Sequence, residues 1–437
     1  MKILNTLLFV LFALSANAAD GTVGTVSVQK GNNVSVNGES PLSLTLDGKD
    51  HQSCQFLSKR APDESHEFTW KEVTTTRGGE LAEILGAQLR SVDSLVVKGY
   101  VNDKDFHAMW DASLYGYLSV INLKNAVLEN NAVPDTAFFH ENEQYEGSSH
   151  EIFYYIGLRK IILPEGLEKI GEGAFYQASA LRQVNFPSTL RYIGDFAFNA
   201  TKLEMNQLVI PEGVEEINQY AFAFCRKLKA QVTLPSTIKK IGEWAFYGCP
   251  ITSINLPEGL ESLGSLAFWD CDLREVSIPS SCHEFNEGWQ FGFNRNLEKM
   301  HLPEGMTEIP DHFAVDCFRL REVNFPHTLK HIGEKAFSLC ISLKNVDLPL
   351  GMQSLGEEAF SELEALEQIV FPASMKSLGK NSCSYWKNIK RIYCAAMEPP
   401  VCDPTDGGVF SGFDFPDGFD TPVVYIPKGT INKYKDT

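Results

Sequence analysis

The stretch that decides the fold is Leu158-Arg-Lys-Ile-Ile-Leu-Pro-Glu-Gly-Leu-Glu-Lys-Ile-Gly-Glu-Gly-Ala-Phe-Tyr-Gln-Ala178. Its order of apolar residues, proline and glycine returns roughly ten times up to Cys394. Successive copies begin 22 to 25 residues apart, at Leu158, Leu181, Leu203, Leu228, Ile251, Leu273, Leu297, Leu320, Leu343, Leu366 and Ile389. This period in a leucine frame is typical of a leucine-rich solenoid, in which each repeat buries its apolar side chains against its neighbours.

Each copy divides into two halves. The first half, as in Leu320-Arg-Glu-Val-Asn-Phe-Pro326, predicts a short strand that ends at the proline, which has no amide donor. The second half, as in Ile241-Gly-Glu-Trp-Ala-Phe-Tyr-Gly-Cys249, has apolar residues four apart, which predicts a helical turn or short helix. The predicted fold is therefore an α/β solenoid, a right-handed leucine-rich repeat. We expect one parallel sheet of about eleven strands on its concave side and short helices or turns on its convex side.

The chain outside the repeats divides by composition. The first 18 residues have one lysine, an apolar run, and Ala16 and Ala18 before Ala19, which predicts a secretory signal peptide. The predicted parts are a signal peptide (1–18), a β-rich lead-in (19–72), divergent N-terminal repeats forming a cap (73–157), the repeats (158–393) and a C-terminal cap (394–437). No later run of 18 apolar residues occurs, so we predict no transmembrane segment.

The charge balance limits the partners. With 38 basic and 56 acidic residues the formal net charge is −18, which opposes the phosphate backbone of nucleic acids. We therefore expect no nucleic-acid partner.

Five of the ten cysteines occupy one position of the repeat: Cys225, Cys249, Cys271, Cys317 and Cys340. Ala178, Thr201, Leu363 and Trp386 take that position in other copies, so burial explains the cysteines better than disulfides do. Cys394 and Cys402 lie outside this series, and an oxidising compartment would favour their pairing.

Signatures of chemistry are missing. The sequence has no G-x-S-x-G, H-E-x-x-H, P-loop, G-x-G-x-x-G or C-x-x-C motif, so we predict no catalytic residue, metal site or cofactor. His327 and His331 lie four apart at variable surface positions. The acidic stretch 140–150 has two histidines, but its spacing matches no known metal site, and a solvated loop is the favoured interpretation.

Two surfaces are candidates for binding. The first follows the strand position two residues before each proline, which is short and polar in the middle repeats: Asn255, Ser277, His301 and Asn324. The second follows the other half of the repeat, where aromatic residues gather in one part of the chain: Tyr220, Trp244, Tyr247 and Trp269. A solvated sheet face and packing between adjacent turns are the respective alternatives.

The combination L-P-E-G-L-x-x-I-G-x-x-A-F-x-x-C, present with small variations at 163–178, 234–249 and 256–271, resembles the BspA-like (Treponema-type) leucine-rich repeat. The resemblance implies an exported bacterial protein, secreted or at the cell surface, and some members of the family act as adhesins. Two copies depart from the pattern. Phe285-Asn-Glu-Gly-Trp-Gln-Phe-Gly-Phe293 replaces I-G-x-x-A-F and puts local regularity in doubt, whereas Phe313-Ala314 inverts the A-F pair at nearly unchanged volume.

We therefore predict a non-catalytic binding protein, an adhesin or recognition protein for a protein or glycan partner. Two alternatives remain: an enzyme whose site lies in residues 19–157 with the repeats as a recognition arm, and a self-associating structural surface protein. A pocketed cluster of carboxylates or histidines in the N-terminal part would favour the enzyme.

Overall fold

The computed structural model describes residues 66–139, 156–402, 408–410 and 422–435, together with the backbone of three short strands nearer the N-terminus. Those strands are β1 (Gly24–Gln29), β2 (Asn33–Gly38) and β3 (Leu44–Thr45); β1 pairs antiparallel with β2 and parallel with β3. The predicted signal peptide, Cys54 and the acidic stretch 140–150 lie outside the described residues. The chain divides into two compact units, Met1–Pro164 with Ala174–Asn185, and Glu165–Gly173 with Phe186–Thr437.

The first unit contains a parallel five-stranded sheet in the order β10-β8-β6-β5-β4. Its strands are β4 (Trp70–Thr75), β5 (Ser94–Val101), β6 (Val120–Leu128), β8 (Lys160–Ile162) and β10 (Gln183–Val184). This unit also contains α2 (Leu81–Leu85), η2 (Gly86–Ser91), α3 (Asp103–Tyr115), η3 (Glu129–Asn131) and β7 (Ala132–Val133). Helix α3 begins at Asn102, whose side chain accepts the Lys104 N–H while Asp105 accepts the Asn102 N–H, a capping box. The parallel sheet thus begins at Trp70, inside the stretch predicted as lead-in.

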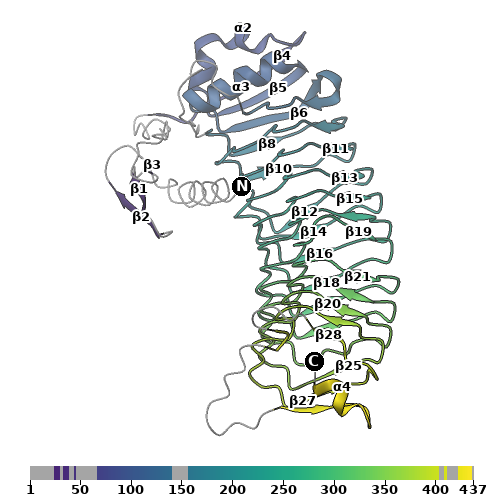
Figure 1. Ribbon diagram of the computed structural model, residues 1–437. Coiled ribbons are helices and arrows are strands. Elements are labelled where there is room, and N and C mark those ends of the chain that lie inside the picture. The colour runs from purple at the N-terminus through teal and green to yellow at the C-terminus, as the bar shows by residue number, and fades with distance from the viewer. Residues whose placement is uncertain are drawn as a thin grey trace. The chain divides into compact units, whose positions relative to one another are not determined.

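In the second unit, strands one repeat apart lie side by side (Figure 1). The strand half of the repeat forms β12 (Gln207–Val209), β14 (Gln231–Thr233) and β16 (Ser253–Asn255); β18 (Glu275–Ser277), β20 (Lys299–His301) and β22 (Glu322–Asn324); and β25 (Gln368–Phe371), β27 (Arg391–Cys394) and β29 (Val423–Tyr425). All of these pairings are parallel, as predicted. The expected single sheet is wrong, however, because this ladder is divided into three sheets of three strands.

A second ladder was not predicted. It comes from the two residues that end at the isoleucine or leucine of the second half-repeat, as in β15 (Lys240–Ile241). One sheet holds β9 (Lys169–Ile170), β11 (Tyr192–Ile193), β13 (Glu216–Ile217), β15, β17 (Ser262–Leu263) and β19 (Glu284–Phe285); another holds β21 (Glu308–Ile309), β23 (His331–Ile332), β24 (Ser354–Leu355), β26 (Ser377–Leu378) and β28 (Val401–Cys402). These strands are parallel as well. Each full repeat therefore contributes up to two short strands.

The rest of the second half-repeat forms turns. Between residues 156 and 402, all of which the structure describes, no helix occurs. In the copy at 241–249, the Ala245 N–H donates to the Gly242 carbonyl and the Cys249 N–H to the Phe246 carbonyl, which closes two successive β-turns. The third residue of each turn has positive φ, 59° at Trp244 and 66° at Gly248. The short helices expected here are thus wrong, and the turns are correct.

The amide donors explain why a helix does not form. The N–H groups of Trp244, Phe246 and Gly248 donate to carbonyls of the next repeat, those of Ser265, Ala267 and Trp269, at 2.9, 2.9 and 2.8 Å. A helix would direct these donors to carbonyls of its own preceding turn. Hydrogen bonding between repeats therefore replaces hydrogen bonding within a helix.

The phenylalanine of the A-F pair forms the core. Six of these rings in the second unit are fully buried and contact their neighbours at centroid distances of 5.3 to 5.6 Å; they are Phe198, Phe222, Phe246, Phe268, Phe291 and Phe313. The irregular copy keeps this order, because Phe291 takes the core position despite one extra residue after Phe285. Gly288 permits this with a φ of 78°, where a Cβ would lie 1.9 Å from the Asp311 carbonyl oxygen.

The repeated cysteine position is buried and also supplies a donor. The Cys249 thiol donates to the Phe222 carbonyl at 2.9 Å, and the Asn294 amide and Trp386 indole donate to the equivalent carbonyls of Phe268 and Phe360, both at 2.7 Å. Burial raises the pKa of the Cys249 thiol well above its usual range, which keeps it protonated.

All nine cysteines among the described residues are unpaired. Sequence analysis left open whether Cys394 pairs with Cys402, and the two are not bonded in this structure. Cys394 ends β27 in the first ladder, whereas Cys402 belongs to β28 in the second, and the Cys394 sulfur lies 3.1 Å from the Tyr434 hydroxyl.

Candidate binding surfaces

Half-buried aromatic side chains follow the turns of the second unit. We call this set the aromatic ridge: Phe196, Tyr220, Trp244, Tyr247, Trp269, Trp289 and His312. Phe196 stacks on Tyr220 at 4.7 Å between ring centroids, and Tyr220 on Trp244 at 5.3 Å. Trp244 contacts Tyr247 at 4.5 Å. The ridge thus includes all four aromatic residues predicted as a binding surface.

A second group of rings continues the ridge after Leu266, which takes the ring position of the intervening repeat. Trp269 contacts Trp289 at 5.1 Å, and Trp289 stacks on His312 at 3.6 Å with 11° between the ring planes. Sequence analysis missed Trp289 because the extra residue in that copy moves it out of the expected spacing. Allowing one insertion after Phe285 would have found it.

The backbone places the ridge residues but does not require aromatic side chains there. Phe196, Tyr220, Trp244, Trp289 and His312 have positive φ, between 55° and 66°. At the same turn position, Lys335, Glu358 and Asn381 have φ of 51° to 52°. The left-handed conformation costs a non-glycine residue roughly 1 to 2 kcal/mol. Since charged and amide residues also bear this cost, the backbone conformation does not explain why this part of the chain has aromatic side chains.

The surroundings of the ridge disfavour charge on its own polar atoms. Burial raises the pKa of Tyr220 to about 12, with Glu243 adding to the effect, and burial also raises the pKa of Tyr247. Desolvation lowers the pKa of His312, whose Nδ1 is buried and has no hydrogen-bond partner among the described residues. Arg226 lies at the rim, bound to Asp270 at 2.9 Å. The ridge is therefore neutral, with charges beside it.

The strand positions predicted as a second surface differ in their surroundings. The Asn324 carboxamide accepts the Leu302 N–H and donates to the Leu302 carbonyl, both at 2.9 Å, so it acts as part of the ladder. His301 Nε2, on β20, lies 3.2 Å from Glu275 Oε1 on the neighbouring strand β18, and both side chains are exposed. Asn255 and Ser277 are exposed, and neither side chain has a hydrogen bond within the described part of the chain. Asn324 is thus committed to structure, while Asn255 and Ser277 remain open to a partner.

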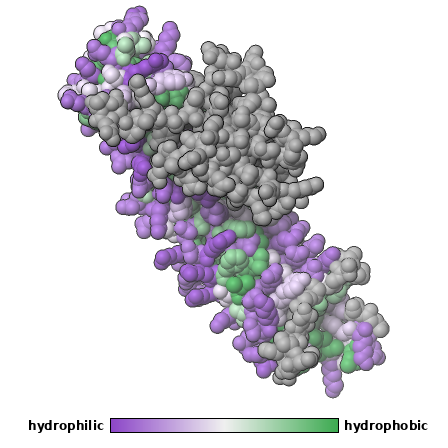
Figure 2. Space-filling view, turned by 90° about the vertical axis from the view of Figure 1, so that its left-hand side faces the viewer, coloured by the Kyte–Doolittle hydropathy of each residue, from purple (hydrophilic) through white to green (hydrophobic). Residues whose placement is uncertain are grey.

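Figure 2 shows a face of the molecule on which hydrophilic side chains predominate and hydrophobic ones appear in separate patches. No group of three or more potential metal ligands occurs among the described residues. His327 and His331 bond to different neighbours, Glu304 at 3.0 Å and Ser354 at 2.7 Å. None of the described helices has the length and hydropathy needed to cross a membrane.

Among its described residues, the first unit contains a partly buried histidine–carboxylate pair. His66 Nε2 lies 2.8 Å from Asp93, and its ring stacks on Tyr117 at 3.6 Å. Asp93 also accepts the Thr69 N–H at 2.9 Å, which ties the start of β4 to the strand that follows it. These contacts give the pair a structural role.

The parallel ladders with a period of about 23 residues define a leucine-rich repeat solenoid. The family model for the BspA-type leucine-rich repeat region matches residues 148–231, 230–337 and 312–397, which together cover more than half of the chain. The chain belongs to this family.

One solved structure supports the fold. A leucine-rich repeat protein from Bacteroides ovatus is 20% identical, with a TM-score of 0.51 over 85% of this chain and 93% of that one. A leucine rich cell surface protein from Faecalibacterium prausnitzii is 21% identical with a TM-score of 0.35, over 60% of this chain and 82% of that one. The pneumococcal vaccine antigen PcpA is 16% identical with a TM-score of 0.36, over 94% of this chain and 95% of that one. No curated protein matches the chain.

Proposed function

We propose that this chain is an exported, non-catalytic binding protein, secreted or displayed at a bacterial surface, that recognises a protein or glycan through the aromatic ridge. The observation that carries the proposal is the run of half-buried, mutually stacked rings at turn positions that tolerate lysine, glutamate and asparagine elsewhere. Recognition energy concentrates in tryptophan, tyrosine and arginine anchors. Aromatic faces of this kind suit both apolar protein side chains and sugar rings.

The adjoining strand surface extends this proposal. Asn255 and Ser277 are exposed and can supply hydrogen bonds to a partner that also contacts the rings. We further infer that the coil is right-handed, as connections between parallel strands of one sheet almost always are.

The test is substitution of the rings by a residue that suits the same backbone. Asparagine tolerates the left-handed conformation, and Asn381 already occupies the position of Trp244 in another repeat. A double variant, Trp244→Asn with Trp269→Ser, should bind its partner at least tenfold more weakly, since two anchors are lost. The cost in stability should stay near 1 to 2 kcal/mol for each half-buried ring, below that of a fully buried one.

Partners would be sought on a glycan array and on a panel of extracellular matrix proteins, and affinity measured by biolayer interferometry. Lys335→Asn is the matched control, because it changes the same turn position at a similar positive φ without removing a ring. Equal binding by the double variant and the wild type would refute the ridge as the site. Concentration-dependent assembly in analytical ultracentrifugation, lost with the rings, would favour the structural alternative instead.

A further inference from the structure

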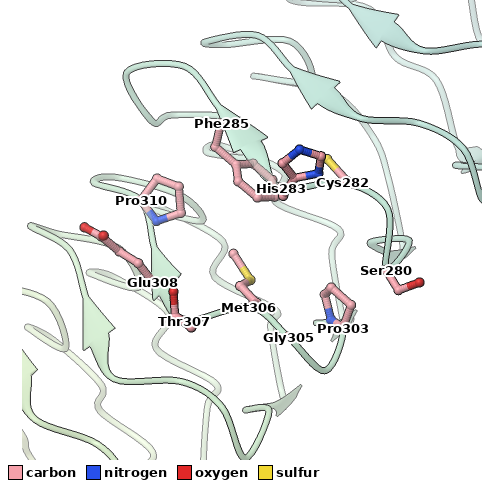
Figure 3. Close-up of a pocket in the computed structure, with 10 residues that line it drawn as sticks. All are labelled: Ser280, Cys282, His283, Phe285, Pro303, Gly305, Met306, Thr307, Glu308 and Pro310. Carbon is pink, nitrogen blue, oxygen red and sulfur yellow. The ribbon is translucent and has the colours of Figure 1, made fainter.

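A pocket of about 460 Å³ opens between two consecutive repeats of the second unit. One wall comes from the turn of β19 and includes Cys282, His283 and Phe285. The other wall comes from the turn of β21 and includes Met306, Thr307 and Glu308. Figure 3 shows the Phe285 ring and the Met306 side chain between the two turns, with Glu308 and Ser280 toward opposite ends.

The pocket coincides with an interruption of the second ladder, since β19 ends one sheet and β21 begins another. At neighbouring junctions the residue after the strand donates its N–H to the previous strand: Gly264 to Ile241 at 2.8 Å, Asn286 to Leu263 at 3.2 Å and Gly333 to Ile309 at 2.9 Å. After β21 this residue is Pro310, which has no N–H. The Phe285 carbonyl therefore lacks the donor that its equivalents have.

Between the same two strands, further backbone N–H and carbonyl groups also lack the hydrogen bonds that their equivalents make. One repeat later, the N–H groups of Lys330 and His331 both donate to the Thr307 carbonyl, at 2.9 and 3.2 Å. The equivalent bonds from Thr307 and Glu308 to the His283 carbonyl are absent from the described structure. The pocket thus offers two backbone acceptors on one wall and two backbone donors on the other.

The protein itself shows which group completes such an interruption. Where the regular N–H of the second ladder is replaced at Asn218, its carboxamide donates to the Ile193 carbonyl. In the first ladder, the Asn324 carboxamide both donates to and accepts from Leu302. An amide group can thus replace a missing peptide group of the ladder, because it offers both an N–H donor and a carbonyl acceptor.

The same two turns remain joined on either side of the pocket, which limits the ligand's size. Val276 pairs with Met300 in the first ladder, and the Phe291 N–H donates to the Phe313 carbonyl at 2.9 Å. Because these contacts flank the pocket, a continuous strand cannot run through it, so the ligand must be compact.

We propose that this pocket binds a compact ligand through a secondary amide whose N–H meets the Phe285 carbonyl and whose carbonyl meets the Glu308 N–H. Phe285, Met306 and Pro310 provide apolar contact for the methyl group or carbon next to the amide. Two sources supply this chemistry, the N-acetyl group of an amino sugar and a capped peptide end. The site is separate from the aromatic ridge and does not depend on its function.

The experiment is a titration of the full chain with N-acetylglucosamine, glucosamine and N-acetylalanine methylamide, followed by saturation-transfer NMR. We expect at least one amide-bearing probe to bind and glucosamine to bind at least tenfold more weakly. Binding by N-acetylglucosamine identifies an amino sugar as the source, and binding by the capped alanine alone identifies a peptide. Equal binding of both sugars, or no binding of either amide at millimolar concentration, would overturn the proposal.

Pro310→Gly restores the N–H found at the other junctions and should reduce amide binding at least tenfold by closing the ladder. Pro257→Gly makes the same change outside the pocket and should leave binding unchanged. Thr307→Trp, which fills the pocket from an exposed position, gives a second variant should Pro310→Gly fail to fold. Wild-type affinity in either folded pocket variant would contradict the proposed site.

Discussion

At the residue scale, side chains repair or shape the backbone ladders. Asn185 and Asn324 occur at the strand position that sequence alone assigns to a solvated or binding surface. Both carboxamides instead bond to the backbone of the preceding repeat, Asn185 to Leu163 at 2.7 and 3.0 Å. An asparagine on the strand face therefore has a structural role where a backbone N–H and carbonyl of the preceding repeat have no backbone partner.

Asn324→Ala should lower the free energy of unfolding by about 1 to 2 kcal/mol, because it leaves the Leu302 N–H and carbonyl without their partners. Urea unfolding followed by circular dichroism would measure this. Asn255→Ala, at the same strand position but with no side-chain hydrogen bond among the described residues, should change stability by less than about 0.5 kcal/mol. Equal effects of the two variants would show that the carboxamide bonds contribute nothing.

His312 provides a pH-dependent prediction. Desolvation lowers its pKa below the usual 6.5, so the folded state binds fewer protons than the unfolded state. Its neutral form contributes stability above pH 6.5, and this contribution falls as the pH is lowered through 6.5. Melting temperatures between pH 8 and 5 should therefore fall less in His312→Asn than in the wild type.

The control for this measurement is His327→Asn, since the His327 side chain is 94% exposed, against 14% for His312. The control should follow the wild-type pH profile. A His312→Asn profile parallel to that of the wild type would mean that another group causes the loss.

At the element scale, the unit of construction is a turn that closes on the next repeat. Residues i, i+4 and i+8 of the second half-repeat are buried, as they would be on one face of a helix. Two successive four-residue turns give the same spacing, with positive φ at their third residues. The turn N–H groups donate to the neighbouring repeat, so the hydrogen bonds that join the turns also hold the buried phenylalanine rings against one another.

Phe246→Ala should cost about 3 to 5 kcal/mol, because this ring is fully buried between Phe222 and Phe268. Thermal and urea unfolding would measure the loss. Leu350→Ala is the control, since Leu350 is 88% exposed and its truncation should be nearly neutral. A loss below about 1 kcal/mol at Phe246 would contradict a tightly packed ring stack.

At the scale of the whole molecule, stability depends on stacking between adjacent repeats. In such a chain the free energy of unfolding is approximately a sum of repeat and interface contributions. Residues 320–342 form one complete repeat, after which Leu343 resumes the position of Leu320.

Deleting residues 320–342 should therefore leave a folded protein with a β-type circular dichroism spectrum and cooperative unfolding. Deleting only residues 320–331 removes β22 and the first residue of β23 and breaks the frame, so this variant should aggregate or unfold at lower temperature. Similar behaviour of the two deletions would argue against stacking of whole repeats as the source of stability.

The sequence by itself determined the period, the parallel strand before each proline, the buried phenylalanine and the apolar environment of the cysteines. These follow from burial, which leaves a periodic trace in residue type. It also located Tyr220, Trp244, Tyr247 and Trp269 of the ridge, but not Trp289, whose repeat contains one extra residue.

Only the tertiary structure decided where the backbone hydrogen bonds go. The second ladder, the turns in place of helices, the role of Asn324 and the interruption at Pro310 all depend on donors and acceptors that meet between repeats. A spacing of four residues buries the same side chains in a helix and in paired turns, so the residue pattern alone does not distinguish them. The contacts between repeats do, because they fix the partners of the turn amides of Trp244, Phe246 and Gly248.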